Sequence, residues 1–366
     1  MKLDISREEL LPALQSVIGV VERRQTMPIL SNLLIRTDGG NLVLAGTDLE
    51  LELITRCPAN ITATGSATAP ARKFFDIVRG LPDTASLTIE LKEQRLIIRS
   101  GRSRFVLSTL PAAEFPLLDS IDESSSVQVP RNVLRTLLDR TQFAMAHQDV
   151  RYYLNGLLLV ARRDGLRAVA TDGHRLAMSE VAQQSDMAEE MEVIVPRKAV
   201  TELARLLGDD DSAVTLRFSE NHLQVTVGET RFTTKLIDGR FPDYNKVIPR
   251  DCDKVLTGDR ETVRQALTRT AILSNEKFRG VRLNLESARL KMQAQNPDHE
   301  EAEEELEVDY QGEPLEIGFN VNYLLDALGA LEGEQFVMEV KNADSSGLIR
   351  EPDSEDHIYV VMPMRL

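Results

Sequence analysis

The feature that most constrains the fold of this chain is an internal repeat. Matching segments lie roughly 125 residues apart: Thr47-Asp48 and Thr171-Asp172, Arg72-Lys73 and Arg197-Lys198, and Leu110–Pro116 and Ile237–Pro242. In a fainter third copy, Gln295-Asn296 takes the place of the Thr-Asp pair. A period of this length indicates duplicated domains rather than a solenoid of short repeats. We therefore expect three domains, at residues 1–124, 125–250 and 251–366.

Each copy is predicted to contain two halves, and each half begins with a short amphipathic helix followed by strands. Ser6 and Glu9 form a capping box for the first helix, and Asp259 caps the fifth. The second helix is expected to run from Pro70, the third and fourth follow Pro130 and Pro196, and the sixth starts near Asn320. β-type runs follow them: Leu33–Ile35, Leu42–Leu44, Leu87–Leu91, Arg95–Arg99, Leu157–Val160, Val214–Phe218, His222–Val227, Val281–Leu285, Phe336–Val340 and Ile358–Met362. Helices and short antiparallel strands in this order predict an α+β fold.

The composition restricts the class of protein. The formal net charge of −15 argues against nucleic acid, but 25 acidic and only 13 basic side chains fall in residues 250–366. A local basic surface elsewhere is still compatible with DNA binding. The two cysteines do not suggest a disulfide framework. Since no apolar run has the length of a signal peptide or a membrane span, we expect a soluble, cytoplasmic protein with no membrane partner.

Basic side chains recur on the polar faces of the predicted helices: Arg72, Lys73 and Arg79, Arg131 and Arg135, Arg197 and Arg205, and Arg260 and Arg264. On a single helix such a face is typical of solvent-exposed ion pairs. Its repetition favours a shared surface for phosphates, because weak contacts add through counterion release. Two loops, Arg23-Arg24 and Arg151-Tyr152-Tyr153, are either surface turns or further contacts for phosphates and bases.

No motif indicates catalysis or metal binding. The histidines lack metal-ligand spacing, and the sequence has no phosphate loop and no nucleophile elbow. The best catalytic candidate is the pair Asp172 and His174, which would belong to a hydrolase. We favour a structural turn, in which Asp172 accepts backbone amides and Gly173 has a positive φ, because the first copy has no histidine there.

An acidic run and a basic run lie in different copies. In residues 301–309 acidic side chains recur at every second position, which predicts a strand with one acidic face rather than a metal site. The first copy instead carries Arg99, Arg102 and Arg104 around Phe105 and Leu107. Opposite charges on the two edges favour head-to-tail pairing between chains, which gives a ring if the rotation closes.

Over its whole length the chain resembles the β sliding clamp family of bacterial DNA polymerase III. The most specific stretches are Pro70–Gly80, Ser100–Ala113, Ala144–Gly156, Ala170–Ala177, Lys235–Tyr244, Ala271–Arg282 and Tyr359–Leu366. The resemblance implies a non-catalytic processivity subunit without cofactor or metal. Two chains would close a homodimeric ring, with helices on the inner face and antiparallel sheets outside. The implied partners are double-stranded DNA, the replicative polymerase, the clamp loader, translesion polymerases and mismatch-repair proteins.

The resemblance also implies three sets of site residues. DNA contacts carry over to Arg24, Arg72, Lys73, Gln148, Tyr152, Tyr153 and Arg197. A hydrophobic cleft for partner peptides carries over to Leu154, Thr171, Gly173, His174, Arg175, Leu176, Pro242, Lys246, Val247, Val360, Met362, Pro363, Met364, Arg365 and Leu366. The subunit contact would use Phe105, Leu107, Ile272 and Leu273. Lys246 and Asn245 depart from the family pattern, which leaves hydrogen bonding there open.

Two other interpretations stay open at this stage. In the first, the basic helices serve an open DNA-binding adaptor that never closes into a ring. In the second, the chain is a hydrolase that acts through Asp172 and His174. Without the family resemblance, Tyr359–Met364 would be read as a last core strand. Alternation allows that strand to pack inward on one face and line a cleft with the other.

Overall fold

The computed structural model describes residues 1–22, 27–118, 125–185, 187 and 189–365. It divides into two compact units. The first unit comprises Met1–Leu134 and Thr201–Leu236, and the second unit comprises Arg135–Val200 and Ile237–Leu366. Among the described residues, no helix is long and apolar enough to cross a membrane.

The predicted helices are confirmed, with these bounds: α1 Arg7–Val17, α2 Ala71–Arg79, α3 Arg131–Asp139, α4 Arg197–Leu206, α5 Arg260–Thr270 and α6 Val321–Ala330. The side chain of Ser6 caps α1 by accepting the Glu9 amide, and that of Asp259 caps α5 by accepting the Thr262 amide. Asn320 caps α6 in the same way through the Asn322 amide. The caps satisfy amides that have no partner inside a helix, so short polar residues mark these starts in the sequence.

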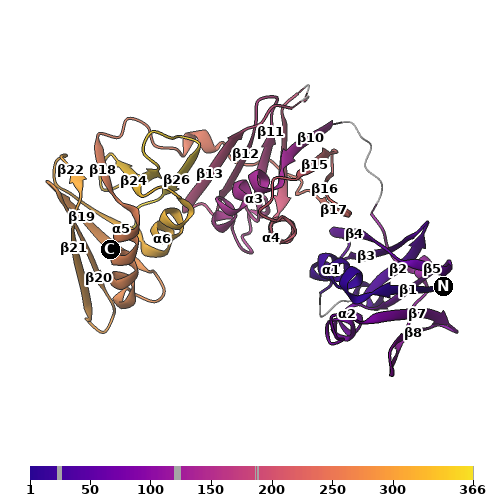
Figure 1. Ribbon diagram of the computed structural model, residues 1–366. Helices are drawn as coiled ribbons and strands as arrows, with labels where there is room; N and C mark the ends of the chain where they lie inside the picture. The colour runs from indigo at the N-terminus through magenta and orange to yellow at the C-terminus, as the bar shows by residue number, and fades with distance from the viewer. Residues whose placement is uncertain (23–26, 119–124, 186, 188, 366) are drawn as a thin grey trace. The chain divides into compact units, whose positions relative to one another are not determined.

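The first unit holds two antiparallel sheets (Figure 1). In spatial order, the strands of one are β5 (Asn60–Ala63), β1 (Lys2–Ser6), β7 (Ser86–Lys92), β8 (Arg95–Ser100) and β9 (Ser103–Ser108). Those of the other are β10 (Ser125–Pro130), β15 (Ala213–Phe218), β16 (His222–Val227), β17 (Thr230–Lys235), β4 (Leu51–Pro58), β3 (Asn41–Thr47), β2 (Asn32–Asp38) and β6 (Ser66–Pro70). Helices α1 and α2 pack against each other, and the buried residues Leu10, Leu14 and Phe74 belong to their inner faces.

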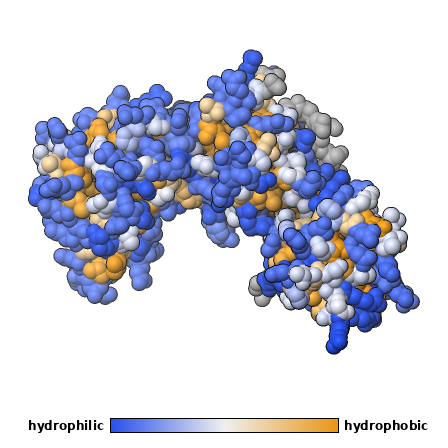
Figure 2. Space-filling view, viewed as in Figure 1, coloured by the Kyte–Doolittle hydropathy of each residue, from blue (hydrophilic) through white to orange (hydrophobic). Residues whose placement is uncertain are grey.

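The second unit holds two further sheets. The strands of the larger one are β14 (Met191–Pro196), β11 (Gly156–Ala161), β12 (Gly165–Thr171), β13 (Arg175–Ala182), β26 (His357–Val361), β25 (Gly347–Arg350), β24 (Gln335–Val340), β18 (Lys254–Asp259) and β22 (Asp309–Tyr310). Those of the smaller one are β21 (Glu301–Glu307), β20 (Arg289–Gln295), β19 (Gly280–Glu286) and β23 (Leu315–Asn320). Helices α5 and α6 pack against each other. Most of the face seen in Figure 2 is hydrophilic, and hydrophobic residues appear on it as separate patches.

The order of elements confirms the repeat and its two halves. Each copy runs strand, helix, three strands, strand, helix, three strands, with β5 and β22 as the additions in the first and third copies. All the β-type runs named above fall within or overlap these strands. The domain boundaries at 124 and 250 stay a prediction.

Sheet pairing joins consecutive copies by one rule. The last strand of the second copy, β17, pairs antiparallel with β4, the third of the strands that follow the first helix of the first copy. The last strand of the third copy, β26, pairs in the same way with β13, the corresponding strand of the second copy. The repeat therefore has a donor strand at its end and an acceptor strand in its first half.

Candidate functional site

The turn between β12 and β13 has the geometry predicted for it. One carboxylate oxygen of Asp172 accepts the amides of His174 at 2.9 Å and Arg175 at 3.0 Å, and Gly173 has a φ of 87°. The Thr171 hydroxyl accepts the Gly173 amide and donates to the Arg175 carbonyl. Among the described residues, no hydrogen bond joins the Asp172 carboxylate to the His174 ring. The carboxylate is occupied by the backbone, which favours a structural role over acid–base chemistry.

The same turn recurs in the first copy, and the third copy has a related one. In the first, Asp48 accepts the amides of Glu50 and Leu51. In the third, Asn296 accepts those of Asp298 and Glu300. Only the second copy has glycine at the left-handed position, where the first copy strains Leu49 to a φ of 81°. A turn that the first copy forms without a histidine serves the fold first.

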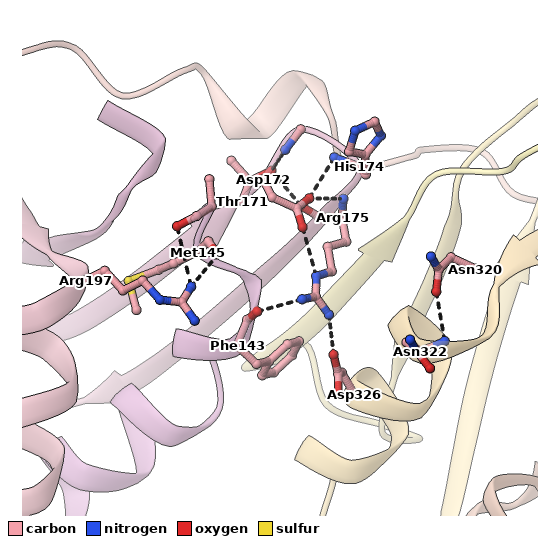
Figure 3. Close-up of polar contacts among 12 residues, drawn as sticks. Phe143, Met145, Thr171, Asp172, His174, Arg175, Arg197, Asn320, Asn322 and Asp326 are labelled. Carbon is pink, nitrogen blue, oxygen red and sulfur yellow. Dashed lines mark hydrogen bonds and ion pairs between the residues drawn. The ribbon is translucent and has the colours of Figure 1, made fainter. Parts of the chain in front are cut away.

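Arg175 connects this turn to α6, as Figure 3 shows. Its guanidinium binds the Asp172 carboxylate at 3.2 Å, donates to the Phe143 carbonyl at 2.7 Å and pairs with Asp326 of α6. The guanidinium carbon also lies 5.3 Å from the ring centroid of Phe143 and 4.4 Å from that of Tyr323. The side chain is 13% exposed. Its polar groups and stacking faces are therefore largely used within the unit.

An apolar cluster lies beneath the turn. Its buried members come from several strands and from the segment after β17: Ala146, Leu154, Leu158, Val160, Val169, Leu176, Met178, Ile194, Phe241, Tyr244, Leu348, Ile358 and Val360. Val247 is half-buried and packs against this cluster. Leu154, Leu176 and Val360 are almost fully buried, so they form the floor of any cleft here rather than its walls.

The C-terminal residues run along the edge of this region. The Met362 amide donates to the His174 carbonyl at 2.9 Å, and the Met364 amide donates to the Gly318 carbonyl at 2.9 Å. Met362 is 39% exposed, and Pro363 and Met364 are half-buried. The structure thus brings the 171–176 turn, Val247 and residues 360–364 together. We call this region the cleft, after the peptide cleft that the family resemblance implies for these residues.

Other candidate cleft residues lie at the surface. Pro242 and Lys246 are exposed, and the Lys246 ammonium pairs with Asp243 at 3.2 Å. A hydrogen bond from Lys246 is the main cause of a lowered pKa at Asp243. Arg365 is also exposed, and Leu366 lies outside the described residues.

The candidate DNA contacts of the second unit gather around one loop. Tyr152 is exposed, and its ring meets that of Tyr153 edge-on with centroids 5.7 Å apart. Gln148 has a φ of 56°, and Arg197 donates to the Met145 carbonyl at 2.8 Å, which places the start of α4 beside this loop. Neighbouring Arg151 is turned to Asp149, whose pKa its hydrogen bond lowers to about 2.

Arg72 and Lys73 lie in the first unit, exposed on α2, where Arg72 also donates to the Val21 carbonyl. Arg24 lies outside the described residues. Many other helix arginines are already paired, as Arg131 is with Asp210, Arg205 with Glu202, and Arg264 with Glu261. The basic helix faces are accordingly less available to phosphates than their sequence spacing indicates.

Two outer strands carry the charges predicted for chain pairing. In the part of the chain that the structure describes, β9 pairs only with β8 and β21 only with β20. Arg104 of β9 lies directly opposite Arg99, a like-charge pair that is unfavourable by itself. Every second residue of β21 is an exposed glutamate. Of the apolar candidates, Ile272 is 74% exposed, Phe105 and Leu273 are half-buried, and Leu107 is buried in its own unit.

Several residues of this site were missed by the sequence analysis. Phe143, Tyr323 and Asp326 meet Arg175, and Tyr244 accepts a hydrogen bond from Arg167 at 2.8 Å. Burial raises the pKa of Tyr323. These partners come from segments far apart in the chain, and no local pattern of residue spacing predicts contacts between such segments. Among the described residues, no group of His, Cys, Asp or Glu side chains is arranged to hold a metal ion.

Three family models cover nearly the whole chain. The N-terminal, central and C-terminal domains of the DNA polymerase III beta subunit match residues 1–119, 128–243 and 245–365, respectively. The beta sliding clamp of Pseudomonas putida is 52% identical over 367 aligned positions, and that of Escherichia coli K12 is 49% identical, with all of each chain covered.

Solved structures agree with these matches. The DNA polymerase III subunit beta of Pseudomonas aeruginosa superposes with a TM-score of 0.97 at 52% identity. The pol III beta of Caulobacter crescentus superposes with a TM-score of 0.95 at 43% identity. Both comparisons cover the full length of each chain.

Proposed function

Because this chain belongs to the family of DNA polymerase III beta subunits, the beta sliding clamps, we propose that two copies close head to tail into a ring around duplex DNA. The ring tethers the replicative polymerase for processive synthesis and binds DNA without reading its sequence. Its task needs no chemistry of its own, so we propose that it is not an enzyme. The cytoplasm, where a bacterial chromosome lies, is the compartment that this role requires.

The pairing rule of the repeat carries this proposal. Each copy ends in a donor strand and has an acceptor strand in its first half, and both internal junctions, β17 with β4 and β26 with β13, obey the rule. The third copy still has its acceptor, β21, and the first copy still has its donor, β9. A second chain supplies the missing partner for each. The same surface repeated head to tail closes a ring when the rotations add to a full turn.

Charge and burial support the same contact. The β9 edge carries Arg104, with Arg102 in the turn before it and Arg99 opposite Arg104 on β8, whereas β21 carries glutamates at 301, 303, 305 and 307. Glutamates from a second chain would relieve the repulsion between Arg99 and Arg104. Beside this edge Ile272 exposes 74% of its surface, and an apolar side chain of this kind supplies the desolvated centre of an interface.

Weak contacts with DNA suit a ring that slides. We propose that Arg24, Arg72, Lys73, Gln148, Tyr152, Tyr153 and Arg197 contact the sugar-phosphate backbone. Contacts of this kind position a duplex without reading its bases. The extensive pairing of the helix arginines keeps phosphate binding modest, so that topology rather than affinity retains the DNA.

We further propose that the cleft binds short apolar peptides of the polymerase, the clamp loader, translesion polymerases and mismatch-repair proteins in turn. Met362 and Met364 give its wall a flexible apolar surface that adapts to different side chains. The fixed turn at Asp172 and the tail hydrogen bonds at His174 and Gly318 hold that wall in place.

Retention on DNA tests the ring. Protein loaded by its clamp loader is expected to stay on a nicked circle and to leave after the circle is linearised. Equal retention on both forms would instead favour an open adaptor. A charge-reversed variant, Arg102→Glu with Arg104→Glu, is expected to be monomeric by light scattering and to escape from the circle.

Adding the compensating reversal, Glu301→Arg with Glu303→Arg, provides the control for a direct contact between the two edges. The quadruple variant should recover dimers, because each reversed edge again faces the opposite charge. A quadruple variant that stays monomeric would argue that these edges do not meet.

A further inference from the structure

A loop follows the first helix of every copy, and two of the three loops hold DNA contacts proposed above. Each first helix ends in a short 3-10 turn, at Ile18–Val20, Gln142–Ala144 and Ala271–Leu273. The segment after this turn holds these candidate contacts in the first two copies: Arg24, Gln148, Tyr152 and Tyr153. The third copy has Asn275–Arg279 at this place, and none of the roles proposed above uses it. We call this segment the third loop.

A shared hydrogen bond sets the register between the third loop and its counterpart in the second copy. The first amide of α4, that of Arg197, donates to the Asn155 carbonyl at 3.0 Å. The first amide of α6, that of Val321, donates to the Arg279 carbonyl at 2.7 Å. Arg279 therefore ends the third loop beside α6, as Asn155 ends the DNA loop of the second copy beside α4.

The third loop carries the cations that its neighbouring helix lacks. The first turns of α2 and α4 contain Arg72-Lys73 and Arg197-Lys198, whereas α6 starts with Val321-Asn322. In the third loop, Lys277 is exposed and Arg279 is half-buried. Among the described residues, neither of these two side chains has a carboxylate partner, unlike most of the helix arginines. Both are therefore available to an anion.

The composition of the third loop resembles that of the first copy's loop. A single glutamate precedes two cations in each: Glu22 comes before Arg23 and Arg24, and Glu276 before Lys277 and Arg279. Because Arg24 is itself a candidate DNA contact, one acidic side chain at this place is compatible with phosphate binding.

Hydrogen bonds fix the main chain of the third loop. The Asn275 side chain accepts the amides of Lys277 at 2.9 Å and Phe278 at 3.0 Å. The Arg279 amide donates to the Asn275 carbonyl at 2.8 Å, and Asn320 donates to the Phe278 carbonyl at 3.3 Å. The Lys277 ammonium lies 5.2 Å from the centroid of the Phe278 ring. Because the backbone is already ordered, binding through this loop costs little additional entropy.

The acidic residues near the third loop have other partners. Phe278 lines a pocket of about 510 Å³ with Met364 and with Glu301 and Glu303 of β21. Glu303 already pairs with Lys291 at 3.0 Å. Both glutamates also belong to the edge that we propose to meet the basic edge of a second chain. Pairing of the chains would therefore neutralise the acid beside this loop.

The second copy shows that such a loop stays exposed beside a junction between copies. Phe143 has the position in its 3-10 turn that Ile272 has in the third copy. Its ring lies 5.9 Å from that of Tyr359, across the pairing of β13 with β26. Tyr152 of the same loop is nevertheless 57% exposed. A chain contact through Ile272 is therefore expected to leave Lys277 accessible.

We propose that Lys277 and Arg279 of the third loop contact the phosphates of duplex DNA. The third copy then contributes to the DNA surface at the same place as the other two. Such contacts add through counterion release and position a duplex without reading its bases. The inference rests on the DNA-binding function proposed above and extends it to a copy that had no assigned contact.

Fluorescence anisotropy tests the idea with the purified dimer and a labelled duplex of about 30 base pairs, titrated at several salt concentrations. Lys277→Ala with Arg279→Ala should weaken binding at low salt. It should also make the slope of log Kd against log salt shallower by at least about 1, because each phosphate contact contributes about 0.9 to that slope. A second duplex of unrelated sequence should give the same change. An unchanged slope would overturn the proposal.

Two further pairs of variants serve as controls. Arg163→Ala with Lys341→Ala removes the same charges from exposed positions in the β11–β12 and β24–β25 turns, and should leave the slope unchanged. Arg72→Ala with Lys73→Ala removes two of the DNA contacts proposed above and should make the slope shallower. Light scattering on each variant checks the dimer. If the loop variant is monomeric, the loop serves the chain contact and the proposal is wrong.

The remaining outcomes separate this inference from the function on which it rests. If the α2 pair changes the slope and the loop pair does not, the DNA contacts of the other copies stand and only the third loop is excluded. If neither pair changes it, the proposed DNA contacts fail together. If the turn pair changes the slope as much as the loop pair, net charge is responsible and the third loop is not a site.

Discussion

Replacing Arg175 with alanine is expected to loosen the pairing of β13 with β26. The side chain is 13% exposed and binds Asp172, Asp326 and the Phe143 carbonyl. Its loss leaves that carbonyl without its donor and removes the stacking on Phe143 and Tyr323. The unpaired carbonyl costs about 1–2 kcal/mol, and the lost stacking and the lost half-exposed ion pair cost about 1 kcal/mol each. The free energy of local opening of β13 should therefore fall by about 3 kcal/mol.

Hydrogen exchange measured by mass spectrometry suits this prediction, because a chain with several domains does not unfold in one step. The amides of Leu176 to Ser179, in the segment of β13 that pairs with β26, should exchange about 100-fold faster, since each 1.4 kcal/mol is a factor of ten. Arg175→Lys should recover only part of the protection, because a lysine ammonium cannot reproduce the planar guanidinium that donates to Asp172, Asp326 and the Phe143 carbonyl together.

Arg264→Ala is the matched control, since Arg264 pairs only with its own helix neighbour Glu261 in the described structure. Its removal should leave exchange in β13 unchanged. The reasoning fails if both alanine variants accelerate β13 equally, or if Arg175→Ala leaves these amides as protected as before. Asp326→Asn should reproduce part of the Arg175 effect without adding fully to it, because the two residues form one network.

Three further outcomes are expected. Ile272→Ala with Leu273→Ala should give monomers by light scattering, and an unchanged dimer mass would contradict the proposed apolar centre. Deleting residues 362–366 should abolish polymerase binding in a pull-down while the dimer mass stays the same; intact binding would refute the cleft. Burial, with the charge of Arg140 second, lowers the pKa of His357 below 6.5. Stability should therefore fall as pH drops from 6.5 through the folded pKa, and His357→Asn should flatten this slope in melting temperatures.

The local signals in the sequence were sufficient for the helices and for the repeat. Ser6 and Asp259 cap the helices that they were predicted to cap, and Asn320 caps the helix that was predicted to start near it, because capping depends on residues three positions apart or fewer. The turn at Asp172 was predicted for the same reason. The period of the repeat and the alternation of glutamates in β21 are also one-dimensional patterns, and the chain keeps them in its fold.

No single segment of the sequence predicts which strands pair across copies. That β17 joins β4, and β26 joins β13, depends on how whole sheets pack, and only these junctions expose the rule that points to a second chain. The same holds for the partners of Arg175, because Phe143, Tyr323 and Asp326 lie far from it in the chain; its place in a peptide cleft stays a prediction. Contacts between residues far apart in the chain depend on packing, which leaves no periodic trace in the sequence.

The sequence by itself determined the internal repeat, the helix starts and the two charged edges, because these follow from spacing and residue type over a few positions. Only the tertiary structure decided that most helix arginines are paired, that Leu154 and Val360 form a buried floor, and that Phe278 and Met364 line the same pocket. Burial and the choice of partner are properties of the packed chain, since each depends on residues that the sequence separates and the sheets bring together.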